Sequence, residues 1–182
     1  AYSALGSLIG VLIKADQLIV SARYAVYLVP LSLLFSTIGL IGAFVTKDFQ
    51  VQYVWAHSNR AMEPQYIWVA FYAGNEGSLL YIAMAMSVFA AFAIYFSPRA
   101  VQPSLPHITL VLMGVLAFFV AVTAFLANPF TLHDFLPADG QGMNPLLTHP
   151  GMFIHPPLLM AGLTAVTVPF GFVLGSLISG RT

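Results

Sequence analysis

Five histidines are the side chains in this sequence best suited to bind a transition metal, because a neutral imidazole nitrogen is a ligand for zinc and iron. They are His57, His107, His133, His149 and His155. A zinc site formed by several of them is one alternative, but no His-Glu-x-x-His spacing supports it. The sequence has no cysteine, which excludes disulfides, thiolate metal sites and thiol redox chemistry.

His155 has the most constrained setting of the five, because Pro156 and Pro157 follow it directly. Proline suits the first turn of a helix, where its missing N–H has no partner to lose, and it favours an extended conformation in the preceding residue. We therefore expect His155 at the entrance of a helix with its ring free to face a ligand. The positive end of that helix would favour an anionic group nearby. A histidine that merely caps the helix is the simpler alternative.

The other candidate residues have weaker patterns. His149, in Leu-Leu-Thr-His-Pro-Gly, is either a second ligand beside His155 or an ordinary loop residue. His57 and His133 are expected to be exposed loop residues. Glu76 begins an apolar run, where a carboxylate can bind the free N–H groups of a helix start, so we expect a structural role for it.

Composition shows what must position these residues. Of 182 residues, 59% are hydrophobic and only 7% are charged, and the mean hydropathy is +0.89. A soluble domain normally has about a quarter charged residues, so a lipid bilayer is the natural solvent of this chain. Six basic and six acidic residues leave no net charge, which excludes a basic surface for nucleic acid.

Uncharged apolar runs predict an all-α fold, a polytopic transmembrane helix bundle that forms one domain over residues 1–182. Five crossings are expected, with four as the alternative. The run 1–13 is too short to span alone, and we interpret it as the tail of a span whose start lies outside the sequence. Gly39 and Gly42 are expected to allow close helix contact. The predicted spans are 1–13 (partial), 24–46, 77–97, 106–127 and 152–179.

The connections predict the orientation in the membrane. Two longer loops, 47–65 and 128–151, contain Lys47 and Arg60, whereas the opposite side has four basic residues: Lys14, Arg23, Arg99 and Arg181. The excess of basic residues favours the cytoplasm for the short loops, so both long loops and His155 are expected to be extracytoplasmic. His107 then lies at the cytoplasmic face, too far from His155 to form a haem-binding pair within this chain.

Four segments of the chain, in this order, resemble the N-terminal part of the CcmF-type haem lyase subunit of cytochrome c maturation. In the fourth and most specific segment, Asn144, Pro145, Pro156 and Pro157 are motif residues with structural roles. Together the segments cover about Asp48 to Phe170. They are Asp48–Val54 with Ser58-Asn59, Tyr66 to the Gly74-Asn75-Glu76-Gly77-Ser78-Leu79-Leu80 run, Asn128-Pro129-Phe130, and Asn144-Pro145-Leu146-Leu147 through Ile154-His155-Pro156-Pro157 to Val168-Pro169-Phe170.

The resemblance implies a component that positions haem at the outer membrane face for covalent attachment to apocytochrome c. It assigns His155 as one external axial ligand of the haem iron, with haem bound transiently and shared with other parts of the system. Implied partners are other cytochrome c maturation subunits, a haem chaperone, apocytochrome c and membrane lipid. The implied location is the bacterial cytoplasmic membrane or an organelle inner membrane.

The sequence also departs from the family pattern. Tyr72, Ala73 and Asn75 replace the usual Trp, Gly and His or Gln of the second segment. The tryptophan-rich loop, the second external histidine and the paired membrane histidines of the family do not occur in these 182 residues. Three interpretations are open: part of a longer haem lyase, one chain of a split protein, or a non-catalytic membrane scaffold that docks partners through its outer loops.

Overall fold

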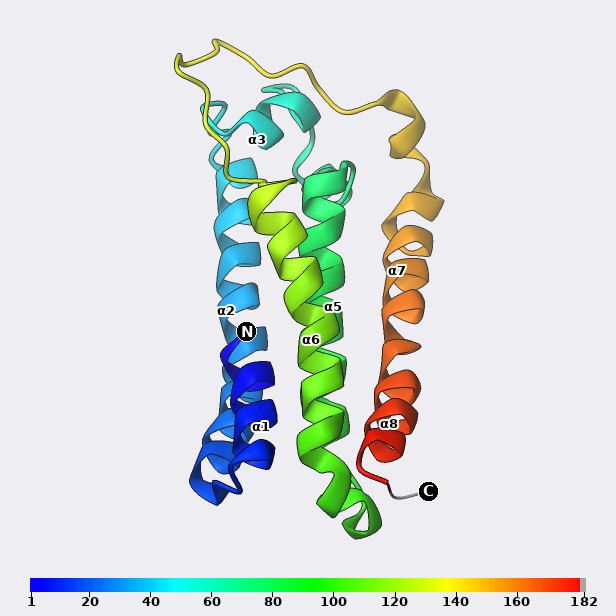
Figure 1. The fold of residues 1–182 in the computed structure, drawn as a ribbon. Helices are drawn as coiled ribbons and strands as arrows, with labels where there is room; N and C mark the ends of the chain where they lie inside the picture. Colours follow the sequence, from blue (N-terminus) through cyan, green and yellow to red (C-terminus); the bar gives the residue numbers. More distant parts are fainter. Residues whose placement is uncertain (181–182) are drawn as a thin grey trace. The chain divides into compact units, whose positions relative to one another are not determined.

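The computed structural model describes residues 1–180, which form α-helices joined by loops and short 3-10 turns (Figure 1). Arg181, one of the basic residues in the orientation prediction, and Thr182 lie outside the described residues. Within residues 1–180 the only β pairing is an isolated bridge between Val51 and Leu132. The α-helices are α1 (Tyr2–Leu12), α2 (Asp16–Val45), α3 (Gln52–His57), α4 (Ile67–Phe71), α5 (Asn75–Tyr95), α6 (Leu105–Phe125), α7 (His155–Ala165) and α8 (Thr167–Ile178), and the 3-10 turns are η1 (Pro64–Tyr66), η2 (Arg99–Ser104), η3 (Pro145–Thr148) and η4 (Pro150–Phe153).

Four helical stretches in the described part of the chain are long and apolar enough to cross a membrane. A helix needs about 20 apolar residues for this, and α1, with 11 residues, is too short to cross alone. The prediction of an all-α, polytopic membrane helix bundle is therefore confirmed, with four stretches of spanning length and a short apolar helix before them. The four stretches are Asp16–Val45 (30 residues), Asn75–Tyr95 (21), Arg99–Phe125 (27) and Pro150–Ile178 (29).

The chain forms two compact units, which we describe separately. The first unit contains Ala1–Leu33, Ala83–Phe119 and the chain from Ala161 onward, and the second contains Leu34–Ile82 and Val120–Met160. The short connections, including the turn with Arg99, belong to the first unit, and both long loops belong to the second. The single domain expected from the sequence stays a prediction.

Proline explains where the last predicted span is interrupted. The run expected as one span, 152–179, is two helices, α7 and α8, separated at Val166. Pro169 has no N–H to donate to the carbonyl of Ala165, and its ring would clash with that carbonyl in a regular helix. The interruption therefore lies where proline makes continuous helical bonding impossible.

Close helix packing in the first unit occurs at Gly171 and Gly175 of α8. A Cβ atom built on Gly175 would lie 2.6 Å from the Cα of Ile108 in α6, so only glycine permits this approach. The four-residue spacing of the two glycines is the one that brings membrane helices together. The expectation for Gly39 and Gly42 is wrong, because within residues 1–180 no atom beyond the neighbouring backbone of α2 lies within 4 Å of a Cβ built there.

Candidate functional site

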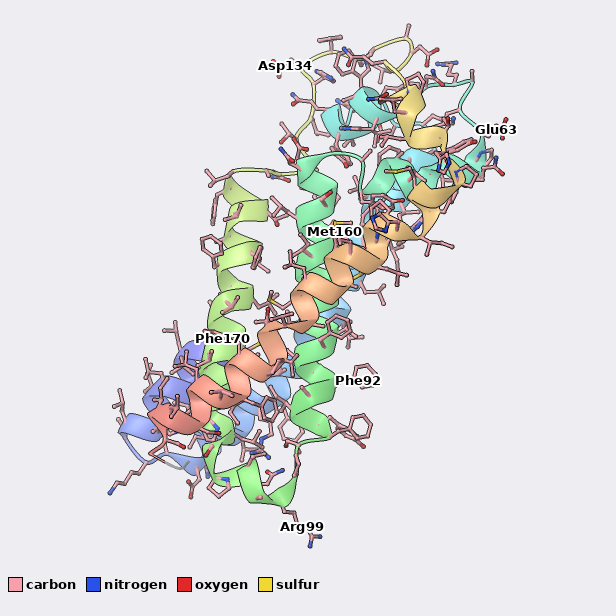
Figure 2. All side chains as sticks on the ribbon, turned by 90° about the vertical axis from the view of Figure 1, so that its right-hand side faces the viewer. Glu63, Phe92, Arg99, Asp134, Met160 and Phe170 are labelled. Carbon is pink, nitrogen blue, oxygen red and sulfur yellow. The ribbon has the colours of Figure 1, made fainter. Side chains whose placement is uncertain are left out.

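The two long loops of the second unit, residues 46–74 and 126–154, are joined by backbone hydrogen bonds. Glu63 in the first loop and Asp134 in the second lie at the same end of this unit (Figure 2). The joints are the antiparallel bridge between Val51 and Leu132, the N–H of Gln52 donating to the Thr131 carbonyl (2.9 Å), and the N–H of His133 donating to the Gln50 carbonyl (2.8 Å).

A second joint between the loops is built on Asp139. Its carboxylate accepts hydrogen bonds from the backbone N–H groups of Arg60 (2.8 Å) and Gly140 (2.7 Å), and the Arg60 guanidinium donates to the Ala138 carbonyl (3.1 Å). These N–H groups favour the charged carboxylate and hold the pKa of Asp139 below its usual value of 3.8, with the positive charges of Arg60 and Lys47 as smaller causes. The joint is therefore strongest while Asp139 is ionised.

This lowered pKa predicts how the joint responds to acid. The stabilisation is fully present above the ordinary carboxyl pKa and is lost as the pH falls through the lowered pKa of the folded protein. We expect amide hydrogen-exchange protection of Arg60 and Gly140 to decrease in that acidic window, and Asp139→Asn to be less protected at neutral pH with no such decrease. Asp134→Asn is the control. Identical pH profiles for the wild type and Asp139→Asn would contradict this assignment.

A tight turn precedes α5 and explains the glycines of the Gly-Asn-Glu-Gly-Ser segment. A Cβ atom on Gly77 would lie 1.7 Å from the carbonyl oxygen of Phe71 and 2.5 Å from the Tyr53 hydroxyl. That hydroxyl donates to the Phe71 carbonyl (3.1 Å) and accepts from the N–H of Gly74 (2.9 Å). Burial is the main cause that raises the pKa of Tyr53, so the hydroxyl keeps its proton as a donor. The turn before α5 is thus built around one buried tyrosine hydroxyl, which the sequence did not indicate.

Three aromatic side chains hold the backbone on both sides of His155. The Trp68 indole N–H donates to the Phe153 carbonyl (3.2 Å), the Tyr72 hydroxyl donates to the Met152 carbonyl, and the Tyr81 hydroxyl donates to the Pro157 carbonyl (3.1 Å). We call Trp68, Tyr72 and Tyr81 the aromatic clamp. Burial, with a smaller effect of Tyr81, raises the pKa of Tyr72 to about 12, so this hydroxyl remains a donor at neutral pH.

His155 is the first residue of α7 and its side chain is exposed. The helix therefore starts at His155 itself, and the N–H of Leu158 closes its first turn on the carbonyl of Ile154 (3.1 Å). Pro156 and Pro157 lie in this first turn, where their missing N–H groups cost nothing. Within residues 1–180 the imidazole has no hydrogen-bond partner or ring contact, which leaves both its nitrogens available to a ligand.

The other motif residues of the second long loop have local structural contacts. The Asn144 side chain accepts from the N–H of Leu146 (3.0 Å) and begins η3, with Pro145 in its first turn. His149 begins η4, and its Nδ1 accepts from the N–H of Gly151 (3.0 Å). His149 and His155 are both exposed and make no contact with each other. No group of three or more His, Asp or Glu side chains in residues 1–180 is arranged to bind a metal ion.

His57 and His133 do not lie freely on the surface as the sequence suggested. Both are half-buried, and both line one cavity together with Glu76. Their sequence neighbourhoods gave no sign of this, because the bridge between the two long loops creates the cavity wall. Glu76 lies in the first turn of α5, and its carboxylate makes no hydrogen bond to another described residue.

Fold and site together define a polytopic membrane protein without cysteine in this chain. Its second long loop leads into a helix that starts at the exposed His155, and the aromatic clamp holds the backbone on both sides of this residue. Comparison with known proteins gives the family. The chain is 35% identical over 167 residues to the cytochrome c-type biogenesis protein CcmF of Escherichia coli and 34% identical over 168 residues to that of Haemophilus influenzae. It is 33% identical over 178 residues to the cytochrome c-type biogenesis protein NrfE of Haemophilus influenzae. The chain belongs to the CcmF and NrfE family of cytochrome c-type biogenesis proteins.

The matches cover nearly all of this chain but only a small part of each relative. They cover 91%, 91% and 94% of this chain, but 26%, 26% and 27% of the three relatives. The chain therefore spans about a quarter of the length of the curated relatives it matches. No protein-family model and no solved structure matches the chain.

Proposed function

We propose that this chain is a component of the cytochrome c maturation system that positions haem at the outer membrane face for attachment to apocytochrome c. The names of the relatives support the maturation role. The proposal that the chain positions haem is supported by the exposed imidazole of His155. This residue lies at the start of α7, between backbone carbonyl groups that the aromatic clamp holds. The protein then lies in a bacterial cytoplasmic or organelle inner membrane with its long loops outside.

The residues around His155 fit haem. An imidazole nitrogen without an internal partner is an axial ligand of the type that haem iron accepts. Ile154, Leu158 and Leu159 are 64%, 65% and 64% exposed and provide apolar surface for a porphyrin. His149 is a candidate for a further contact with the group, and any other iron ligand would have to come from outside residues 1–180.

The chain contributes to the reaction by holding haem in position for apocytochrome c. Bound haem supplies two vinyl groups to which cysteine thiols of apocytochrome c add. His155 fixes the iron, the aromatic clamp fixes His155, and the resulting orientation of reactants lowers the barrier without a cysteine in this chain. A haem chaperone and the other maturation subunits are the partners that deliver haem and complete the site.

A non-catalytic membrane scaffold that docks partners through its long loops is the second candidate. It is favoured by large apolar side chains that the second long loop exposes outside the spanning helices, since such groups typically mark interaction surfaces. They are Leu132 (53% exposed), Phe135 (64%), Leu136 (74%) and Leu146 (81%).

The test is His155→Ala in the chain purified with its natural partners. We expect a several-fold loss of bound haem and of mature cytochrome c, because the iron loses an axial ligand. Haem occupancy is measured by absorption spectroscopy, and added imidazole should restore part of it. His107→Ala, in the first unit, is the control. Unchanged haem occupancy and cytochrome c yield in His155→Ala would reject the ligand role and favour the scaffold.

A further inference from the structure

A cavity of about 310 Å³ lies in the second unit, between α3, the start of α5, the end of α6 and the bridged strand of the second long loop. Its volume is in the range of small-molecule sites. The cavity is separate from His155, and nothing in the proposed function uses it. It is lined by Gln52, Tyr53, Trp55, Ala56, His57, Glu76, Leu126, Ala127, Asn128, Thr131 and His133.

The hydrogen-bond roles of His57 can be deduced. Its Nδ1 lies 2.9 Å from the backbone carbonyl oxygen of Tyr53, and a carbonyl only accepts, so Nδ1 carries the proton. The Nε2 of the neutral ring is therefore a bare acceptor. A Cβ atom on Gly74 would lie 2.7 Å from this Nε2, so glycine is needed there for the ring to stand in its place.

His133 provides a second polar group without a partner. Its Nε2 is fully enclosed and has no hydrogen bond within residues 1–180. Its ring is held by the rings of Trp55 (centroids 4.9 Å apart) and Phe135 (5.1 Å). Because this nitrogen is enclosed, a ligand in the cavity does not reach it, and His133 contributes to the cavity as part of its wall.

The charges around the cavity favour a cation. Glu76 contributes a carboxylate without a hydrogen-bond partner among the described residues, and no Lys or Arg lines the cavity. Leu126 and Ala127 follow the end of α6, where free carbonyl groups form the negative end of a helix dipole. The half-buried Trp55 adds an aromatic ring to the lining, and such a ring attracts cations. An anion would be repelled by the Glu76 carboxylate, and a metal ion would lack a three-ligand cluster in residues 1–180.

We propose that this cavity binds an organic cation, a primary ammonium or guanidinium group. Such a group brings several N–H donors for the Glu76 carboxylate and the imidazole acceptor of His57, and a positive charge for the ring of Trp55. The ammonium comes either from a lipid headgroup or from a free amine. The inference does not depend on haem or on His155.

The experiment titrates the purified chain, in phosphatidylglycerol nanodiscs at about pH 8, where an alkylammonium is charged, with n-butylammonium and n-propylguanidinium. Binding is followed by the fluorescence of Trp55, identified by its loss in Trp55→Phe. We expect saturable binding that Glu76→Gln weakens about tenfold or more, because Gln keeps the shape but removes the charge. Asp134→Asn, which changes a long-loop carboxylate outside the cavity, should bind as the wild type does.

Further arms identify the source and the charge preference. If a lipid headgroup occupies the cavity, the affinity for n-butylammonium should be lower in nanodiscs that contain phosphatidylethanolamine. If the affinity is the same in both kinds of nanodisc, the site is assigned to a free amine. Both results support the proposal. Three results would overturn it: no saturable signal with either cation, equal affinity for butyrate, or equal affinity in a Glu76→Gln variant whose circular dichroism matches the wild type.

Discussion

Replacing Gly77 by alanine is expected to lower the free energy of unfolding by about 3 kcal/mol or more, at the upper end of overpacking effects. The added Cβ would overlap the Phe71 carbonyl oxygen at 1.7 Å, and a backbone atom cannot move aside as a side chain can. The turn must open, and the Tyr53 hydroxyl then loses its bonds to Phe71 and Gly74. Thermal unfolding followed by circular dichroism measures the effect.

Gly39→Ala is the matched control in the same unit. No described atom lies within 4 Å of a Cβ at Gly39, and the residue lies inside α2. Alanine there is expected to leave stability unchanged or to raise it by about 0.5–1 kcal/mol, the usual gain over glycine in a helix. Equal destabilisation by Gly39→Ala and Gly77→Ala would show that the turn is not the cause.

The second large effect is expected from opening the aromatic clamp with Tyr72→Phe and Tyr81→Phe together. Each change removes one hydroxyl and with it the hydrogen bond to the carbonyl of Met152 or of Pro157. A lost bond to a buried group costs about 1–3 kcal/mol, so we expect about 2–4 kcal/mol of local stability to be lost. The consequence is a mobile backbone around His155.

The mobility can be measured directly because the chain has no native cysteine. Ile154→Cys, at a position 64% exposed, carries a single spin label. Its spectrum should sharpen markedly in the Tyr72→Phe/Tyr81→Phe background. Tyr24→Phe, an exposed tyrosine of α2 in the first unit, is the control. A label that stays equally immobile in both backgrounds would mean that the clamp does not order His155.

Composition predicted the fold well because the bilayer imposes a simple rule: every spanning segment must be a long apolar helix. Proline at Pro156 and Pro157 likewise predicted where a helix begins. Both inferences need only neighbouring residues, so one sequence suffices for them.

The clamp and the cavity could not be predicted in the same way. Trp68 and Tyr81 bind carbonyls that are 85 and 76 positions away in the chain. Nothing in an isolated Trp or Tyr indicates which distant carbonyl it reaches. The small-residue contact shows the same limit, because the sequence analysis expected it at Gly39 and Gly42, whereas packing places it at Gly171 and Gly175.

The second long loop has one more consequence, for its response to proteases. Its backbone is fastened at three successive places: to Gln50 and Gln52, to Arg60, and to the aromatic clamp. These attachments divide one long flexible loop into shorter segments, each of which has less conformational freedom than the whole loop would have. A single cut between Phe135 and Leu136 would consequently leave both new ends tied down, and the clipped protein would keep its shape.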